Sequence, residues 1–315
     1  MKVIKIEAFG GPEMLSLTTV PAPVAKENEV LINVESCGVG GVDILLRKGL
    51  YPGLDNAGFI PGMEIVGIVN SVGANVSEEW ISKRVYAMTT LGGYAEQVVV
   101  NESALVEVPE KLLSDQALSL GINALVAYYS LQRARLSEGE RVYVRGAGGG
   151  IGSLTVQLAL ANKYEVSVAP TAALQRGKLQ HLGVRNFIDL SQWEGDDQKF
   201  DAIIDPVAGS ELAQYIALLK DNGVYVLNGV AAGFPNADFG MEFLKRFQSS
   251  LTITCFSLNS ISADDIRSSL SQIFHLAVDG QITPYVSKVL PFEEAVEAHR
   301  LLESQTVFGK IVLKI

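Results

Sequence analysis

The segment from residue 141 to residue 162 constrains the fold more than any other part of the chain. Residues 141–144 have the character of a short buried strand, and they lead into a cluster of glycines between Gly146 and Gly152. A helical pattern follows directly, up to residue 162. A strand that passes through glycines into a helix brings backbone N–H groups and a helix N-terminus together. This geometry accepts a pyrophosphate, provided that no Cβ atom blocks the approach.

The glycine cluster departs from the usual dinucleotide motif in its first position. The motif G-x-G-x-x-G is absent, and the matching frame begins with alanine. A glycine cluster in a tight turn can also serve structure alone. Because this cluster lies within a series of βαβ units, we favour dinucleotide binding, with Ala147, Gly149, Gly150 and Ile151 as candidate cofactor contacts. We expect the pyrophosphate over Gly149, Gly150 and Ile151.

The hydrophobic period divides the chain into regions of different structure. Residues 1–120 contain short alternating runs separated by Gly and Pro, which predicts a small barrel-like β domain. Helical spacing begins near residue 114, and strands then alternate with helices as far as residue 256. Alternating strands and helices predict right-handed βαβ units and a parallel sheet. Two helices and a final strand at 310–313 are expected after that. The fold class is therefore α/β.

The second strand of the βαβ series bears on the choice of cofactor. A site for NAD has an acidic residue near the end of this strand, about 20 residues after the glycines, to hold the ribose 2′-hydroxyl. Here residues 168–173 contain no carboxylate, and two cations follow. This pattern favours the 2′-phosphate of NADP, with Thr171, Arg176 and Lys178 as candidate contacts. The alternative is that the two cations are solvated charges on a helix.

Charge and cysteine content exclude several classes of function. The chain has 25 Lys and Arg against 35 Asp and Glu, a net charge of −10. A negative field of this size disfavours binding to nucleic acid or to anionic membranes. Two distant cysteines, Cys37 and Cys255, cannot form a disulfide framework. With no run of about 18 apolar residues and no apolar leader, we expect a cytoplasmic protein that acts on a small-molecule substrate.

Together these motifs resemble the medium-chain dehydrogenase/reductase superfamily, in its zinc-independent quinone oxidoreductase (zeta-crystallin-like) branch. The resemblance covers the whole chain and depends on six stretches, at residues 37–43, 47–52, 61–67, 92–96, 147–152 and 308–313. It implies a GroES-like β-barrel catalytic domain (1–120), a Rossmann doubly wound parallel sheet (121–257) and a C-terminal return to the first domain (258–315). It also implies an active site between the domains.

The residues argue against a catalytic zinc ion. Zinc needs three Cys, His or carboxylate ligands and an open position. In the similar zinc alcohol dehydrogenases, a Cys would stand at Gly40 and a His at Met63. The three histidines show no ligand spacing, so we expect no metal.

The resemblance implies hydride transfer from NADPH to a quinone or an α,β-unsaturated carbonyl. Such chemistry needs few catalytic side chains, because the cofactor supplies the hydride and water can protonate the product. Tyr51 is a candidate proton donor, or else a packed loop tyrosine. Asp43 is a second candidate, although orienting the backbone or Arg47 is the more natural role for it. Further candidate cofactor contacts follow later strands: Gly229, Val230 and Phe256.

Two other functions stay open at this point. The same fold could serve an enoyl-thioester reductase or a specialised biosynthetic reductase. A non-catalytic nucleotide-binding protein is the third possibility, since Val126 replaces a threonine that often contacts the nicotinamide in the family.

An apolar strand at residues 251–256 predicts how the chain assembles. Thr252 and Thr254 alternate with apolar residues, and no Lys, Pro or inward charge interrupts the strand. An uncovered edge of this kind invites pairing with its own copy across a two-fold axis. We therefore expect a homodimer with this strand at its interface.

Overall fold

A computed structural model describes residues 1–170, 172–189 and 199–315, so Thr171 lies outside the described residues. The chain forms two compact units: Met1–Ile122 with Ser262–Ile315, and Asn123–Ile261. Each has its own sheet and hydrophobic core. We call them unit 1 and unit 2. No described helix is both long enough and apolar enough to cross a membrane.

Unit 1 is built on a seven-stranded sheet. Six of its strands follow the order β14-β15-β3-β4-β5-β7, and the seventh, β6, pairs with β3. A separate two-stranded sheet joins β1 to β2 in antiparallel register. The long strand β3 pairs with β4, β6 and β15, and so it organises the sheet. The strands are β1 (Lys2–Ile6), β2 (Leu15–Thr19), β3 (Glu29–Val39), β4 (Glu64–Val72), β5 (Arg84–Met88), β6 (Gln97–Asn101), β7 (Leu105–Glu107), β14 (Val286–Pro291) and β15 (Lys310–Lys314).

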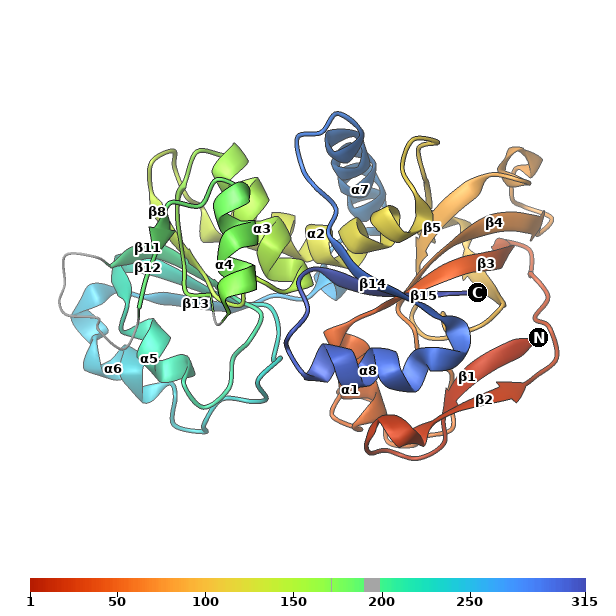
Figure 1. Ribbon diagram of the computed structural model, residues 1–315, viewed down its shortest axis with the longest axis horizontal. Coiled ribbons are helices and arrows are strands. Elements are labelled where there is room, and N and C mark those ends of the chain that lie inside the picture. The colour runs from red at the N-terminus through yellow and green to blue at the C-terminus, as the bar shows by residue number, and fades with distance from the viewer. Residues whose placement is uncertain (171, 190–198) are drawn as a thin grey trace. The chain divides into compact units, whose positions relative to one another are not determined.

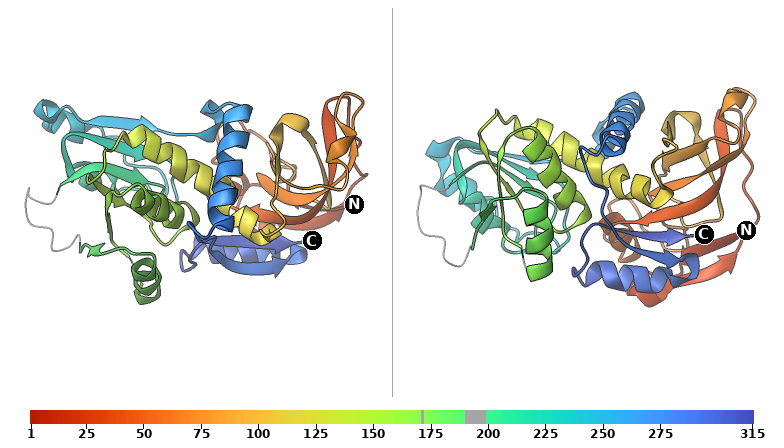
Figure 2. Two further views of the ribbon diagram at one scale, coloured as in Figure 1. Left: turned by 90° about the horizontal axis from the view of Figure 1, so that it is seen from above. Right: turned by 45° about the horizontal axis from the view of Figure 1, so that its top comes forward.

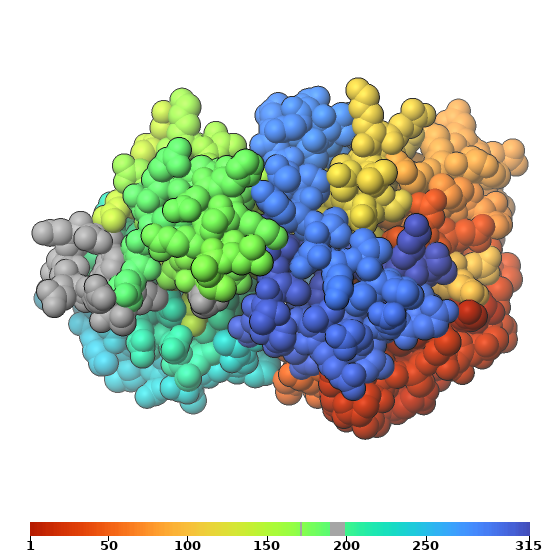
Figure 3. All heavy atoms as spheres, viewed as in Figure 1, coloured from red at the N-terminus to blue at the C-terminus, as the bar shows by residue number. Residues whose placement is uncertain are grey.

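The C-terminal segment completes unit 1. Strand β15 pairs antiparallel with β3, and β14 pairs parallel with β15. Figures 1 and 2 show this blue segment among the red and orange strands of the N-terminal part. In the space-filling view the blue atoms lie directly against red ones (Figure 3). An ion pair of 3.2 Å joins Lys2, in β1, to Glu293, just after β14.

Four helices belong wholly or partly to unit 1: α1 (Gly41–Arg47), α7 (Ala263–Val278), α8 (Ala295–Glu303) and the first part of α2 (Ser114–Ala134). Helix α2 is kinked at Gly121, whose φ of 17° and ψ of −127° are not helical. Ile122, the next residue, donates its freed backbone N–H to Glu64 Oε2 at 3.1 Å. The kink therefore has a specific polar partner. The described 3₁₀ helices of the chain are η1 (Pro12–Met14), η2 (Glu78–Trp80), η3 (Glu102–Ala104), η6 (Phe247–Ser249), η7 (Leu258–Ser260) and η8 (Phe292–Glu294).

Unit 2 contains a six-stranded, entirely parallel sheet with the order β10-β9-β8-β11-β12-β13. The chain starts at the central strand β8, proceeds to one edge through β9 and β10, and then returns to build the other half. Ligands bind at such a switch point, outside the carboxyl ends of the strands. The strands are β8 (Arg141–Val144), β9 (Glu165–Val168), β10 (Asn186–Phe187), β11 (Phe200–Asp205), β12 (Leu219–Leu227) and β13 (Thr252–Cys255).

The helices of unit 2 cover both faces of its sheet. Helix α3 lies on one side of the strands labelled in Figure 1, and α5 and α6 lie on the other. The strand order extends from β8 in both directions, and crossovers of the usual right hand then place helices on opposite faces. The helices after β8 are α3 (Gly150–Ala161), α4 (Ala173–His181), α5 (Leu212–Ile216) and α6 (Met241–Lys245).

The predicted fold class is confirmed: the chain forms a GroES-like β unit and a doubly wound parallel sheet. Three details differ from the sequence expectation. Helix α3 begins at Gly150, three residues before the predicted start, because the glycines themselves form its first turn. Helix α1 and strand β14 were not anticipated, since α1 begins at a glycine and β14 ends at a proline.

Candidate cofactor and active-site residues

The glycine turn of unit 2 has the geometry of an anion site. Gly146 has φ +61°, and a Cβ atom there would approach Val207 Cγ2 to 2.8 Å, so the first turn residue must be glycine. The Gly149 N–H donates to the Gly146 carbonyl at 2.9 Å and closes the turn. Helix α3 begins at the next residue. The turn therefore directs the helix N-terminus to the carboxyl end of β8.

The first N–H groups of α3 have no partner within the helix, as at every helix start. Gly149 is the N-cap, and no side chain caps this end. Gly149 is exposed, while Gly150 and Ile151 are partly exposed. The N–H groups of Gly150 and Ile151 and the positive end of the helix dipole thus face an open approach, which fits a pyrophosphate. Ala147, by contrast, is buried beneath the turn.

Arg176 lies in the first part of α4, which follows β9. Its side chain is exposed, and its guanidinium group lies over the Phe187 ring, 4.4 Å from the centroid. The neighbouring Gln175 is buried instead, and its amide fills the space beside Gly148, within 2.6–3.0 Å of where a Cβ atom would stand. Of these two residues, only Arg176 is accessible to a ligand phosphate.

The remaining candidate contacts follow β12 and β13. Gly229 and Val230 are partly exposed in the loop after β12. Phe256 directly follows β13, but its ring is buried between Tyr129, at 6.2 Å between centroids, and Arg133, whose guanidinium lies 4.1 Å from the ring centroid. Phe256 can therefore offer a ligand its backbone more readily than its ring. All these positions share the carboxyl edge of one parallel sheet with the glycine turn.

Asp43 belongs to unit 1, where it is buried at the start of α1. Its two carboxylate oxygens accept hydrogen bonds from the backbone N–H groups of Gly40, at 2.9 Å, and Gly62, at 3.0 Å. Burial raises the pKa of Asp43 to about 7, against the lowering effect of these two bonds and of Lys310. One oxygen thus bonds to the N-cap of α1 and the other to Gly62, so Asp43 links the loop 61–63 to α1. The Asp43 carboxylate thus bonds to backbone groups, while Arg47 pairs with Glu303, at 2.8 Å.

Tyr51 follows α1 in unit 1 and is partly buried against the hydrophobic core. Within the described ranges, no hydrogen bond occupies its hydroxyl group. Met63 and Leu45 are also partly exposed in this unit. Tyr51 is therefore the candidate whose polar atom is not already committed.

A buried ion pair joins β4 to β15 within unit 1. Lys310 Nζ contacts Glu64 Oε1 directly, and both residues are almost fully buried. Glu64 Oε2 accepts from the Tyr86 hydroxyl at 2.8 Å and from the backbone of Ile122. Glu64 therefore serves as a structural hydrogen-bond partner for three elements.

Gly40 and Met63 occupy the positions at which a zinc dehydrogenase would have ligands. Across residues 1–170, 172–189 and 199–315, no group of three or more His, Cys, Asp or Glu side chains is arranged to hold a metal ion. His299 packs inside unit 1, with its Nε2 atom 3.2 Å from the Tyr94 hydroxyl, and burial lowers its pKa to about 3.

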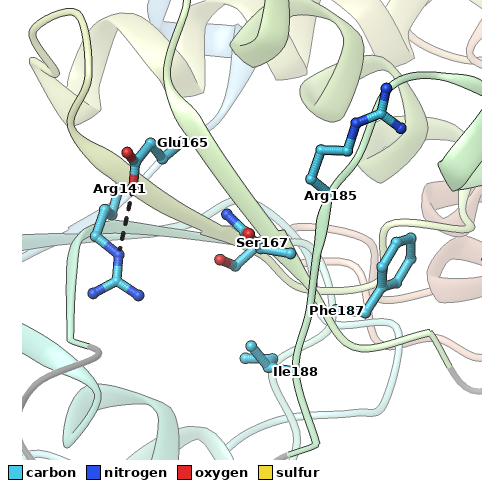
Figure 4. Close-up of a pocket in the computed structure, with 7 residues that line it drawn as sticks. Arg141, Glu165, Ser167, Arg185, Phe187 and Ile188 are labelled. Carbon is cyan, nitrogen blue, oxygen red and sulfur yellow. Dashed lines mark ion pairs between the residues drawn. The ribbon is translucent and has the colours of Figure 1, made fainter.

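A cavity of about 550 Å³ lies at the β9–β10 side of the sheet of unit 2. Figure 4 shows Arg141 and Glu165 on one side of it and Arg185 with Phe187 on the other. Arg141 and Glu165 are the first residues of β8 and β9, so the cavity reaches the amino ends of these strands. The glycine turn is at the opposite, carboxyl end, and we therefore do not assign this cavity to the dinucleotide.

Sequence reasoning did not single out Lys310 or Arg145, although both carry buried charge. Each stands at one end of an apolar strand, Lys310 at the start of β15 and Arg145 directly after β8. In the sequence, a Lys or Arg directly next to an apolar run indicates a buried ion pair, because a buried charge requires a partner.

Two family models match this chain. The alcohol dehydrogenase GroES-like domain matches residues 26–110, and the zinc-binding dehydrogenase domain matches residues 182–313. A quinone oxidoreductase from Sus scrofa is 30% identical over 328 residues, which cover 99% of this chain and 97% of the relative. The chain belongs to the zinc-independent quinone oxidoreductase branch of the medium-chain dehydrogenase/reductase family.

Two solved structures share the fold of this chain over its full length. The mycobacterial protein Rv1454c, in complex with NADPH, has a TM-score of 0.91 at 25% identity and covers 100% of both chains. The quinone oxidoreductase of Escherichia coli, also with NADPH, has a TM-score of 0.92 at 23% identity and covers 100% of both chains.

Proposed function

We propose that this protein is a zinc-independent NADPH-dependent oxidoreductase that reduces a quinone or an α,β-unsaturated carbonyl by hydride transfer. The observation that carries the proposal is the open glycine turn, with the uncapped N–H groups of α3 at the switch point of the sheet. The relatives support it, since one is named quinone oxidoreductase and one solved structure contains NADPH.

Residues of unit 2 are available to bind both the pyrophosphate and the nicotinamide half of the cofactor. The N–H groups of Gly150 and Ile151, next to the exposed Gly149, would bind the pyrophosphate. Gly229, Val230 and the backbone of Phe256, after β12 and β13, would hold the nicotinamide half. NADPH supplies the hydride when it is bound, so the protein needs to bind, orient and keep water away.

The cationic side chain of Arg176 would hold the 2′-phosphate of NADPH, beside β9. Thr171 and Lys178, the other candidates for this contact, remain predictions. In unit 1, Tyr51 would donate a hydrogen bond or a proton to the substrate oxygen. Asp43 would act by holding the loop 61–63 in place, since both its oxygens accept backbone N–H groups.

Titration of the protein with NADPH and NADH, followed by intrinsic fluorescence, tests the cofactor assignment. We expect wild-type protein to prefer NADPH, and Arg176→Ala to weaken NADPH about tenfold while leaving NADH nearly unchanged, because only NADPH carries the 2′-phosphate. Lys163→Gln is the matched control, since it removes one exposed positive charge from unit 2 beyond the far end of α3.

Oxidation of NADPH by a panel of quinones and enones, followed by its absorbance, then tests the reaction. Turnover with one of these acceptors supports the proposal. Tight NADPH binding without oxidation of NADPH by any acceptor would instead favour a non-catalytic nucleotide-binding protein. Equal loss of NADPH and NADH in Arg176→Ala would show that Arg176 is not the discriminating group.

We further propose that the protein forms a homodimer through residues 251–256. Strand β13 is the last strand of its sheet, so one of its edges has no neighbour within the described sheet. Apolar side chains on the segment that leads into β13 are strongly exposed; they are Met241 (52%), Leu244 (64%) and Phe247 (80%). An open strand edge beside exposed apolar side chains is typical of a surface that a second copy covers.

Light scattering at micromolar concentration is expected to give about twice the chain mass. Ile253→Pro should shift the protein toward the monomer, because proline removes a backbone donor and disturbs the edge. Circular dichroism of the same sample checks that the variant is folded. A monomeric wild type, or a dimer that Ile253→Pro leaves unchanged, would contradict this proposal.

A further inference from the structure

Arg145 is a buried cation placed between β8 and the glycine turn. Its Nη1 atom donates to Asp205 Oδ2 at 3.2 Å and to the carbonyl of Ala208 at 2.5 Å. Its Nη2 atom donates to Glu211 at 3.1 Å, and its guanidinium group stacks on Tyr215, 3.9 Å from the ring centroid. One side chain thus ties the end of β8 to the loop that follows β11.

Asp205, the last residue of β11, fixes the shape of this loop, which we call the 206–209 loop. Its Oδ1 atom accepts the backbone N–H groups of Val207 at 2.7 Å and Ala208 at 3.0 Å. Its Oδ2 atom accepts the Tyr225 hydroxyl at 2.5 Å, in addition to Arg145. Ala208 has φ +52°, which is unusual for a residue with a side chain. The bonds from Asp205 and Arg145 hold it in that conformation.

The 206–209 loop touches the glycine turn on one side. Val207 Cγ2 would be 2.8 Å from a Cβ atom on Gly146, so the side chain of Val207 packs directly against the turn. Any movement of Val207 therefore reaches the first residue of the anion site.

On its other side, the loop touches the segment 229–233. The Pro206 carbonyl accepts the Ala231 N–H at 3.2 Å, and it would be only 2.5 Å from a Cβ atom on Gly229. The Val207 carbonyl accepts the Ala232 N–H at 2.8 Å. The 206–209 loop consequently lies between the two segments to which we assign the pyrophosphate and the nicotinamide half.

We propose that Arg145 is a positioning residue for the dinucleotide, which sets the spacing between the glycine turn and the 229–233 segment through the 206–209 loop. This inference rests on the proposed function, since it presumes that a dinucleotide spans both segments. Replacing a buried ion pair with apolar residues often costs little stability, so stability alone does not account for such a network. A role in ligand binding does account for the network, because a ligand that touches two segments binds best when the spacing between them is already correct.

The inference predicts which ligands depend on Arg145. NADPH and NADH span both segments, so Arg145→Lys should weaken both by the same factor, about tenfold, since lysine cannot reach Asp205, Ala208 and Glu211 together. Adenosine 2′,5′-bisphosphate lacks the nicotinamide half, so its affinity should change less than about twofold. A purely structural arginine would not produce this difference between ligands.

Arg246→Lys is the matched control. Arg246 also anchors several backbone carbonyls of unit 2, at Ile216, Ala217 and Leu219, but it does not touch the 206–209 loop. Its variant should lose stability without changing the affinity for any of the three ligands. Dissociation constants from fluorescence titration and melting temperatures from the same samples provide the comparison.

Three outcomes would overturn the inference. The first is an Arg145→Lys variant that binds NADPH like wild type, and the second is one that weakens adenosine 2′,5′-bisphosphate as much as NADPH. If Arg145→Lys does not fold, Tyr225→Phe removes a single bond to Asp205 and should weaken NADPH and NADH alike, about threefold; unchanged affinity there is the third. Wild-type protein that binds neither dinucleotide would instead refute the proposed function itself.

Discussion

Gly149→Val is expected to leave unit 2 folded and to weaken NADPH binding by more than about 100-fold, or about 3 kcal/mol. Gly149 has φ −76°, which any residue adopts, and a Cβ atom there would meet only the Gly146 carbonyl, at 3.3 Å. This contact is tight but needs a shift of only a few tenths of an ångström, so we expect unit 2 to accommodate the side chain. Its branches would then cover the N–H groups at the start of α3. Fluorescence titration with NADPH and thermal unfolding of the same sample measure the two effects.

Two further variants separate binding from folding. Gly149→Ala adds only the tolerated Cβ atom, so it should retain stability and lose less affinity than valine. Gly152→Ala should destabilise the unit, because its Cβ atom would stand 2.2 Å from the Gly146 carbonyl. A folded Gly149→Val variant that binds NADPH as tightly as wild type would refute the assignment of the pyrophosphate to this turn.

Lys310→Met is expected to destabilise the protein by about 3–5 kcal/mol, the typical cost of removing one partner of a buried ion pair. Lys310 and Glu64 have side chains that are only 4% and 2% exposed, so the remaining carboxylate would have no access to solvent. Glu64 also binds the Tyr86 hydroxyl and the backbone at the kink of α2, which links three elements of unit 1 to this one charge. Urea unfolding measures the loss.

Lys314→Met provides the matched control for this variant. Lys314 lies on the same strand β15 but is exposed, so its loss should change stability by less than about 0.5 kcal/mol. The double variant Glu64→Gln with Lys310→Met should recover part of the stability, because it removes the unpaired charge while leaving an acceptor for Tyr86. If Lys310→Met is as stable as Lys314→Met, the pair does not contribute as we describe.

The sequence contained enough local information to predict the elements of unit 2. Short apolar runs alternated with helical spacing, and each such run became a strand of the parallel sheet, from β8 to β13. Glycines at the first βα turn marked the candidate anion site, because only a residue without a side chain permits both the turn and the close approach of a phosphate. Local spacing was sufficient here since each βα unit folds from neighbouring residues.

Contacts between distant residues were less accessible from the sequence. The kink of α2 at Gly121 was hidden in a continuous helical pattern, because the Glu64 carboxylate that binds the freed N–H lies almost sixty residues earlier. Strand β14 forms only by parallel pairing with β15, and its own residues resemble a loop. The sequence left two roles open for Asp43, a catalytic one and the orientation of the backbone or Arg47. It could not choose between them, because Gly62, one of the groups that Asp43 binds, lies in another loop.

The sequence by itself determined the fold class, the family resemblance and the location of the glycine turn, because these depend on hydrophobic period and on residues that are close in the chain. Only the tertiary structure decided how the buried charges are neutralised. Arg145 with Asp205, and Lys310 with Glu64, are separated by 60 and 246 residues. A buried charge is stable only beside its partner, and which partner it meets depends on how the sheets bring distant strands together.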